Sequence, residues 1–127
     1  MDYTILTDIK FKPLELIDAG HLADKCSERW WNQALCRVND CVVRVGVFEG
    51  EFHWHKHNRE DEFFFVIEGK FLIDFKELTE EQTENQTIEL KPRQGFLVPR
   101  GVMHRTRAPQ RSVVLMIEAA TVIPTGD

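Results

Sequence analysis

Alternating histidines followed by a glutamate constrain this chain more than any other feature. One run reads Phe-His-Trp-His-Lys-His, and after a polar gap the chain continues Glu-Phe-Phe-Phe-Val-Ile-Glu-Gly. Because side chains in a β-strand alternate between its two faces, His53, His55 and His57 are expected to share one face. The polar gap suits a hairpin turn, which would place Glu62 beside the three imidazoles.

These four side chains favour a metal site. Imidazole nitrogens and a carboxylate oxygen are ligands that first-row divalent metals accept, and two paired strands would hold them in place. For any one of the four, a structural role is the alternative, since a histidine beside a tryptophan often packs half-buried. For the whole set, that alternative would leave several buried polar groups without partners, at about 1–3 kcal/mol each.

Two motifs in the chain resemble those of the cupin family. The first family motif, G-x5-H-x-H-x3,4-E-x6-G, is similar to the spacing of His55, His57, Glu62 and Gly69. The second, G-x5-P-x-G-x2-H-x3-N, is similar to the run Pro-Arg-Gly-Val-Met-His that ends at His104. The nearest resemblance is to short, single-domain cupins labelled mannose-6-phosphate-isomerase-like. It implies a jelly-roll barrel and a metal held by His55, His57, Glu62 and His104.

The departures from these motifs concern turns more than ligands. Gly50 stands one residue closer to His55 than the first motif requires. The glycine expected six residues before Pro99 is Arg93, and the closing asparagine of the second motif is Ala108. The loops around the pocket therefore need not follow the family, and no substrate is carried over from it.

Further side chains are expected in the pocket beside the ligands. Apolar residues that face inward would exclude water, and an arginine next to the second motif could contact an anionic substrate. The first histidine of the run either contacts metal or substrate, or lies nearer the barrel rim. The candidates are His53, Phe64, Val66, Ile73, Phe96 and Arg100.

The expected cofactor is one divalent transition metal, because three imidazoles favour Mn, Fe, Co, Ni, Cu or Zn over calcium. Two classes of function remain open. As an enzyme, the centre would chelate a small oxygenated metabolite for isomerase- or dioxygenase-type chemistry, with Glu62 as a catalytic base if it detaches. As a non-catalytic module, the same pocket would bind or sense a small molecule.

Length, charge and cysteine count set the broader class. The chain of 127 residues suits one domain, and its net charge of -5 argues against non-specific binding to nucleic acid or anionic membranes. Without a membrane-spanning apolar run or a secretory signal, the expected location is the cytoplasm. An odd number of cysteines is a poor disulfide framework, so Cys26, Cys36 and Cys41 are expected to be reduced thiols.

Short strands separated by turn residues predict an all-β fold, here a single cupin jelly roll with a short N-terminal helical arm. The expected single domain, 1–127, has a covering arm over 1–31, a barrel over 32–120 and a tail over 121–127. Pro13 would open the helix of the arm and Gly20 would end it. Besides the strand that Glu62 opens, strands are expected at 33–38, 41–48, 70–75, 87–90, 96–98, 103–106 and 112–119, with an exposed acidic loop over 76–86.

Both faces of the strand that begins at Glu62 are apolar. Phe63, Phe65 and Ile67 alternate with inward-facing residues, and an outer face in contact with water would not have this composition. Either the N-terminal arm or a second subunit must cover this face. We predict a homodimer whose sheets pack over it.

Overall fold

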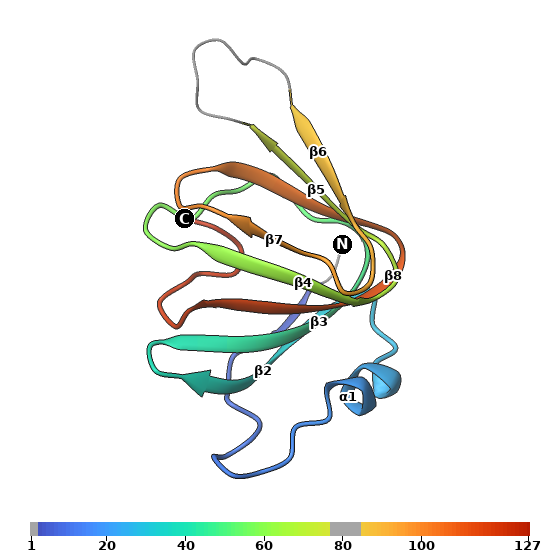
Figure 1. Ribbon diagram of the computed structural model, residues 1–127, viewed down its shortest axis with the longest axis vertical. Helices are drawn as coiled ribbons and strands as arrows, with labels where there is room; N and C mark the ends of the chain where they lie inside the picture. The colour runs from blue at the N-terminus through green and yellow to red at the C-terminus, as the bar shows by residue number, and fades with distance from the viewer. Residues whose placement is uncertain (1–2, 77–84) are drawn as a thin grey trace.

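The computed structural model describes residues 3–76 and 85–127, and in these residues the chain forms a curved barrel of mainly antiparallel strands (Figure 1). The all-β barrel that the sequence predicts is confirmed. Most of the expected acidic loop over 76–86 lies outside the described residues. The elements are β1 (Thr4–Leu6), α1 (Ala19–Lys25), β2 (Trp30–Val38), β3 (Cys41–Glu51), β4 (Glu62–Glu68), β5 (Phe71–Lys76), β6 (Gln86–Leu90), β7 (Gly95–Val98) and β8 (Met103–Ala119).

Strand β8 connects the two sides of the barrel because its halves pair with different strands. Its first part pairs with β5, and its second part lies between β3 and β4. The sequence predicted two separate strands here, at 103–106 and 112–119, and this was wrong. The register against β3 shifts between Phe48 and Gly50, so Pro109 falls in the irregular stretch where no ladder N–H is required.

Two apolar clusters lie on opposite faces of the sheet. Trp30 belongs to the cluster inside the barrel, with Phe48, Phe64 and Met116. Its neighbour Trp31 belongs to the outer cluster, which α1 and the N-terminal segment cover. This follows from the alternation of side chains along β2, because consecutive residues must face opposite sides.

The helix of the arm lies further along the chain than the sequence predicted. It spans Ala19–Lys25, so Gly20 is inside the helix instead of ending it. Asp18 is the N-cap, and its Oδ1 accepts a hydrogen bond of 3.0 Å from the His21 N–H. Leu14 has a φ of 70°, which is incompatible with a helix that begins at Pro13.

The N-terminal arm also contributes a strand to the sheet. Strand β1 pairs in parallel with β2, in the register Thr4 with Trp31. Strand β2 begins at Trp30, two residues before the expected start of the barrel at 32. Helix α1 has seven residues, and no helix in the described ranges is long and apolar enough to cross a membrane.

Candidate metal centre

Two of the expected ligands lie in irregular backbone between β3 and β4. The sequence predicted a strand through His53, His55 and His57, but the only pairing described there is an isolated bridge between His55 and His104. In this bridge each backbone N–H donates to the carbonyl of the other residue at 2.9 Å. Without a continuous ladder the alternation of faces is incomplete, because His55 and His57 are buried while His53 is exposed.

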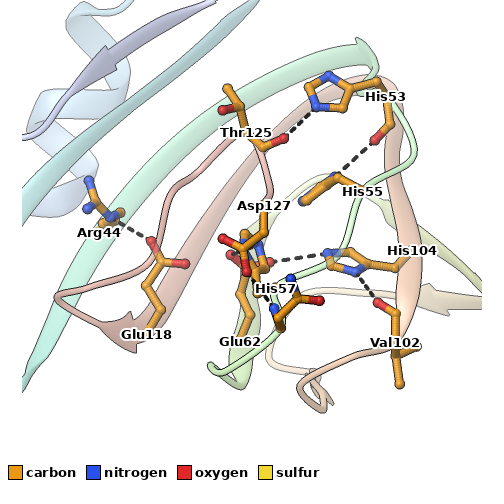
Figure 2. Close-up of polar contacts among 11 residues, drawn as sticks. Arg44, His53, His55, His57, Glu62, Val102, His104, Glu118, Thr125 and Asp127 are labelled. Carbon is orange, nitrogen blue, oxygen red and sulfur yellow. Dashed lines mark hydrogen bonds and ion pairs between the residues drawn. The ribbon is translucent and has the colours of Figure 1, made fainter.

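The structure brings His55, His57, Glu62 and His104 together in one buried cluster (Figure 2). Their ligand atoms lie within 4.8 Å of one another, and each residue is at most 9% exposed. Glu62 opens β4, and its two carboxylate oxygens lie 3.6 Å from His57 Nε2 and 3.5 Å from His104 Nε2. The cluster therefore joins the β3–β4 connection, the start of β4 and the start of β8.

Backbone carbonyls orient two of the imidazoles toward the centre of the cluster. His55 Nδ1 lies 3.0 Å from the carbonyl oxygen of His53, and His104 Nδ1 lies 2.9 Å from that of Val102. A carbonyl can only accept, so Nδ1 carries the proton in both rings and Nε2 keeps its lone pair. This arrangement is common in metal-binding histidines.

Unpartnered polar atoms show that the cluster fits a cation. His104 Nε2 and both ring nitrogens of His57 are buried and have no hydrogen-bond partner among the described residues. Protein interiors seldom leave such atoms unsatisfied, and a divalent transition metal would satisfy several of them at once. The His-His-Glu-His group can thus hold a metal, whose identity its ligands do not select.

Burial controls the protonation of the cluster. It lowers the pKa of His55 to about 3, and it also lowers the pKa values of His57 and His104. The three imidazoles are therefore neutral at pH 7, as metal ligands must be. Burial raises the pKa of Glu62, which a bound cation would reverse by favouring the carboxylate.

Arg44 and Glu118 form a buried hydrogen-bonded pair beside this cluster, which the sequence did not predict. Arg44 Nε donates to Glu118 Oε1 at 2.7 Å, and Glu118 lies opposite Glu62 in the pairing of β8 with β4. Burial and the neighbouring Glu62 raise the pKa of Glu118 to about 9 despite the presence of Arg44. The sequence held one signal of the pair, since each charge interrupts an apolar strand at an inward-facing position.

A cavity of about 40 Å³ adjoins the ligands inside the barrel. Aromatic rings of Trp30, Phe48 and Phe64 form much of its wall, and Asn32 and Glu118 also line it. Of the six pocket residues that the sequence suggested, Phe64 alone is among the residues described as lining this cavity.

The other suggested pocket residues lie elsewhere. Val66 and Ile73 are fully buried in the core, and Phe96 packs against that core. Arg100 is exposed, and its Nε lies 3.9 Å from Asp61. These positions depend on how far along each strand the cavity extends, which alternation of faces does not specify.

The C-terminal segment packs over the metal cluster at His55. His53 Nε2 donates to the carbonyl oxygen of Thr125 at 2.7 Å (Figure 2). The Asp127 N–H donates to the carbonyl of Lys56. Gly126 has a φ of 98°, and a Cβ there would lie 2.6 Å from His55 Cβ. Only glycine allows this close approach.

The protein is therefore a small β-barrel with a candidate metal centre. Three histidines and one carboxylate form this centre beside a cavity. Comparison with known families agrees with this description, because the model of the Cupin domain matches residues 41–119. The chain belongs to the cupin family.

Individual relatives extend this result. Uncharacterized protein YdbB of Bacillus subtilis (strain 168) is 42% identical over 105 residues, which cover 80% of this chain and 87% of the relative. A cupin-2 domain containing protein from Shewanella frigidimarina has a TM-score of 0.71 at 28% identity, covering 82% of this chain and 94% of its own. Hydroquinone 1,2-dioxygenase from Sphingomonas sp. TTNP3, solved with 4-hydroxybenzoate bound, has a TM-score of 0.66 at 18% identity, covering 94% and 88%.

Proposed function

We propose that this protein is a metal-dependent enzyme that acts on a small oxygenated metabolite by isomerase- or dioxygenase-type chemistry. The observation that carries the proposal is the convergence of unpartnered imidazole nitrogens and the Glu62 carboxylate beside an internal cavity. A divalent Mn, Fe, Co, Ni, Cu or Zn ion fits these ligands. When bound, such a cation supplies a Lewis acid for a chelating hydroxyl or carbonyl pair.

The residues around the centre would support this chemistry in distinct ways. Phe64 and Met116 line the cavity with apolar surface, which excludes water and strengthens electrostatic interactions with a bound oxygen. Glu62 has two carboxylate oxygens, so one can remain a ligand while the other accepts a proton from the substrate.

The fold by itself does not select the reaction. The likeness to hydroquinone 1,2-dioxygenase, at 18% identity, concerns the fold, and it supports the proposal only because a barrel of this shape houses a dioxygenase. Measurement of oxygen uptake would therefore distinguish isomerase-type from oxygen-dependent chemistry.

Metal analysis followed by a substrate screen tests the proposed function. Protein purified without chelator should contain about one transition-metal ion per chain, as measured by elemental mass spectrometry. The loaded protein would then be incubated aerobically with small dihydroxy and dicarbonyl compounds, with oxygen uptake and products recorded. Full turnover by metal-free protein would exclude the proposal, and a ligand bound but recovered unchanged would indicate the alternative, a binding or sensing function.

We also propose a cytoplasmic location. Cys26, Cys36 and Cys41 are free thiols in the structure, which suits a reducing compartment. Fractionation of cells that produce the protein, with the protein detected by antibody, would test this location. Recovery in an extracellular or membrane fraction would contradict it.

A further inference from the structure

One buried acceptor atom on the cavity wall has no partner among the described residues. Asn32 on β2 is 6% exposed and lines the same cavity as His55 and Glu62. Its Oδ1 forms no hydrogen bond within the part of the chain that the structure describes. Because native proteins satisfy nearly all such atoms, this oxygen marks a place for a hydrogen-bond donor.

Glu118 does not supply a donor to Asn32. Arg44 Nε contacts Glu118 Oε1 at 2.7 Å, and Glu118 lies opposite the metal ligand Glu62 where β8 pairs with β4 (Figure 2). Asn32 lies on β2, which β3 separates from β8, and it pairs across the sheet with Gly46. The Asn32 amide is therefore a separate polar group on a wall that is otherwise mainly aromatic.

The surroundings restrict the kind of group that fits there. An anionic oxygen would face the side-chain oxygen of Asn32, which can only accept. An ammonium group would lie near the guanidinium of Arg44, whose Nη1 is also buried and has no partner among the described residues. A hydroxyl group avoids both conflicts, because it donates to one acceptor and can accept from a neighbouring donor.

The size of the cavity restricts the rest of the ligand. About 40 Å³ is room for roughly three water molecules, so only a few ligand atoms can be enclosed. Gly46 pairs with Asn32 across the sheet. The Phe48 ring occupies the space that a side chain at 46 would need, because a Cβ there would lie 2.1 Å from this ring. The ligand must therefore be short, with its metal-binding oxygens and its hydroxyl at opposite ends.

We propose that Asn32 forms a second recognition point, which binds a hydroxyl group on a small uncharged metabolite whose other end is held at the metal centre. This inference rests on the proposed function, since it assigns the substrate class of the same site. Asn32 is a specificity residue in this scheme, and it is not a metal ligand.

A pair of chelating probes that differ in one hydroxyl group tests the assignment. Acetohydroxamic acid and glycolohydroxamic acid share the metal-binding end, and only the second carries an additional hydroxyl. Their dissociation constants would be measured by titration of the cobalt(II)-loaded protein, using its visible absorption spectrum. We expect the wild type to bind glycolohydroxamic acid about tenfold more tightly, the effect of roughly one buried hydrogen bond.

Variants of Asn32 show whether that preference comes from the cavity wall. Asn32→Leu removes both polar atoms at nearly constant volume, and Asn32→Ala is a second variant in case the first does not fold. Either variant should bind cobalt with an unchanged spectrum and reduce the preference to less than about threefold. Gln33→Leu is the matched control, because it removes an amide from the opposite face of β2, where Gln33 Nε2 donates to the Asp8 carbonyl.

Equal binding of the two probes by the wild type would overturn the inference and leave the proposed metal function intact. A preference for glycolohydroxamic acid that survives in Asn32→Leu or Asn32→Ala would also overturn the inference alone. Failure of the wild type to bind cobalt, or of the cobalt-loaded protein to bind either hydroxamate, would overturn the proposed function together with the inference.

Discussion

The two backbone carbonyls that hold His55 and His104 make the metal cluster partly preorganised. They fix the ring orientation of both residues before any cation binds, whereas neither ring nitrogen of His57 has a hydrogen-bond partner in the described part of the chain. Of the three imidazoles, His57 therefore contributes least to the fold, and metal binding is its main expected role. This difference between neighbouring residues can be tested by substitution.

Replacing His57 by alanine should abolish stoichiometric metal uptake while the fold survives. The side chain makes no hydrogen bond within the described residues, so its removal breaks no polar contact of the barrel. Metal content would be measured by elemental mass spectrometry and folding by circular dichroism. His53→Ala is the matched control, because His53 is exposed and directed to Thr125, and it should keep its metal. Retained metal in His57→Ala would contradict the assignment of ligands.

Because of the shifted pKa values in the cluster, we expect the metal-free protein to be most stable at about pH 6.5. Above this pH, stability should fall as Glu118 loses its proton, because its folded pKa of about 9 lies above the value of an exposed carboxyl. Below it, stability should also fall, because unfolded imidazoles bind protons that the folded ones, with lowered pKa values, do not.

Urea unfolding of metal-free protein at pH 5, 6.5 and 9 would measure this dependence. Glu118→Gln should flatten the alkaline side of the curve, because an amide has no proton to lose in this range. An unfolding free energy that rises steadily from pH 5 to 9 would show that the folded protein does not keep a buried carboxyl protonated.

At the scale of single elements, α1 depends on its N-cap because the helix is too short to be stable alone. Asp18 Oδ1 accepts the N–H of His21, and replacing Asp18 by alanine should lower the free energy of unfolding by about 1 kcal/mol. Asp24→Ala is the control, an exposed substitution inside the same helix that leaves the cap intact. Equal losses in the two variants, measured by urea unfolding, would show that the cap contributes nothing specific.

Most strands lie where local sequence predicted them, but the hairpin expected between the histidine run and Glu62 does not form, because β4 pairs with β7 and β8. Asn39 and Asp40 fill the gap between the strands expected at 33–38 and 41–48, and Asn39 has the positive φ of 53° that asparagine tolerates. The helix boundary and the long β8 were predicted wrongly, because both depend on contacts made by distant parts of the chain. The positions of a helix cap and of a β-bulge both depend on the elements that pack against them.

At the scale of the whole molecule, the outer face of β4 is only partly covered by the arm. Ile67 and Leu115 pack against the cluster beneath α1, so the arm covers this end of the face. At the other end, Phe63 lies between Leu97 on β7 and Ile117 on β8, which are 51% and 40% exposed. This uncovered row supports the prediction that a second copy of the chain packs there.

Light scattering coupled to size-exclusion chromatography tests the dimer. The mass should be about twice the 14.9 kDa of the chain, and Leu97→Asp should reduce it toward the monomer. Leu16→Asp is the control, since Leu16 is 88% exposed on the N-terminal segment and away from this row. A monomer at all concentrations would contradict the prediction.

The sequence by itself determined which residues are able to bind a metal, and where most of the strands lie along the chain. Both are local properties, since the spacing of His55, His57 and Glu62 and the alternation within each strand need no knowledge of distant contacts. Only the tertiary structure decided that Asn32 and Glu118 line one cavity with His55 and Glu62, and that Arg44 pairs with Glu118. The physical reason is register, because pairing across the sheet places residues side by side that are far apart in the chain.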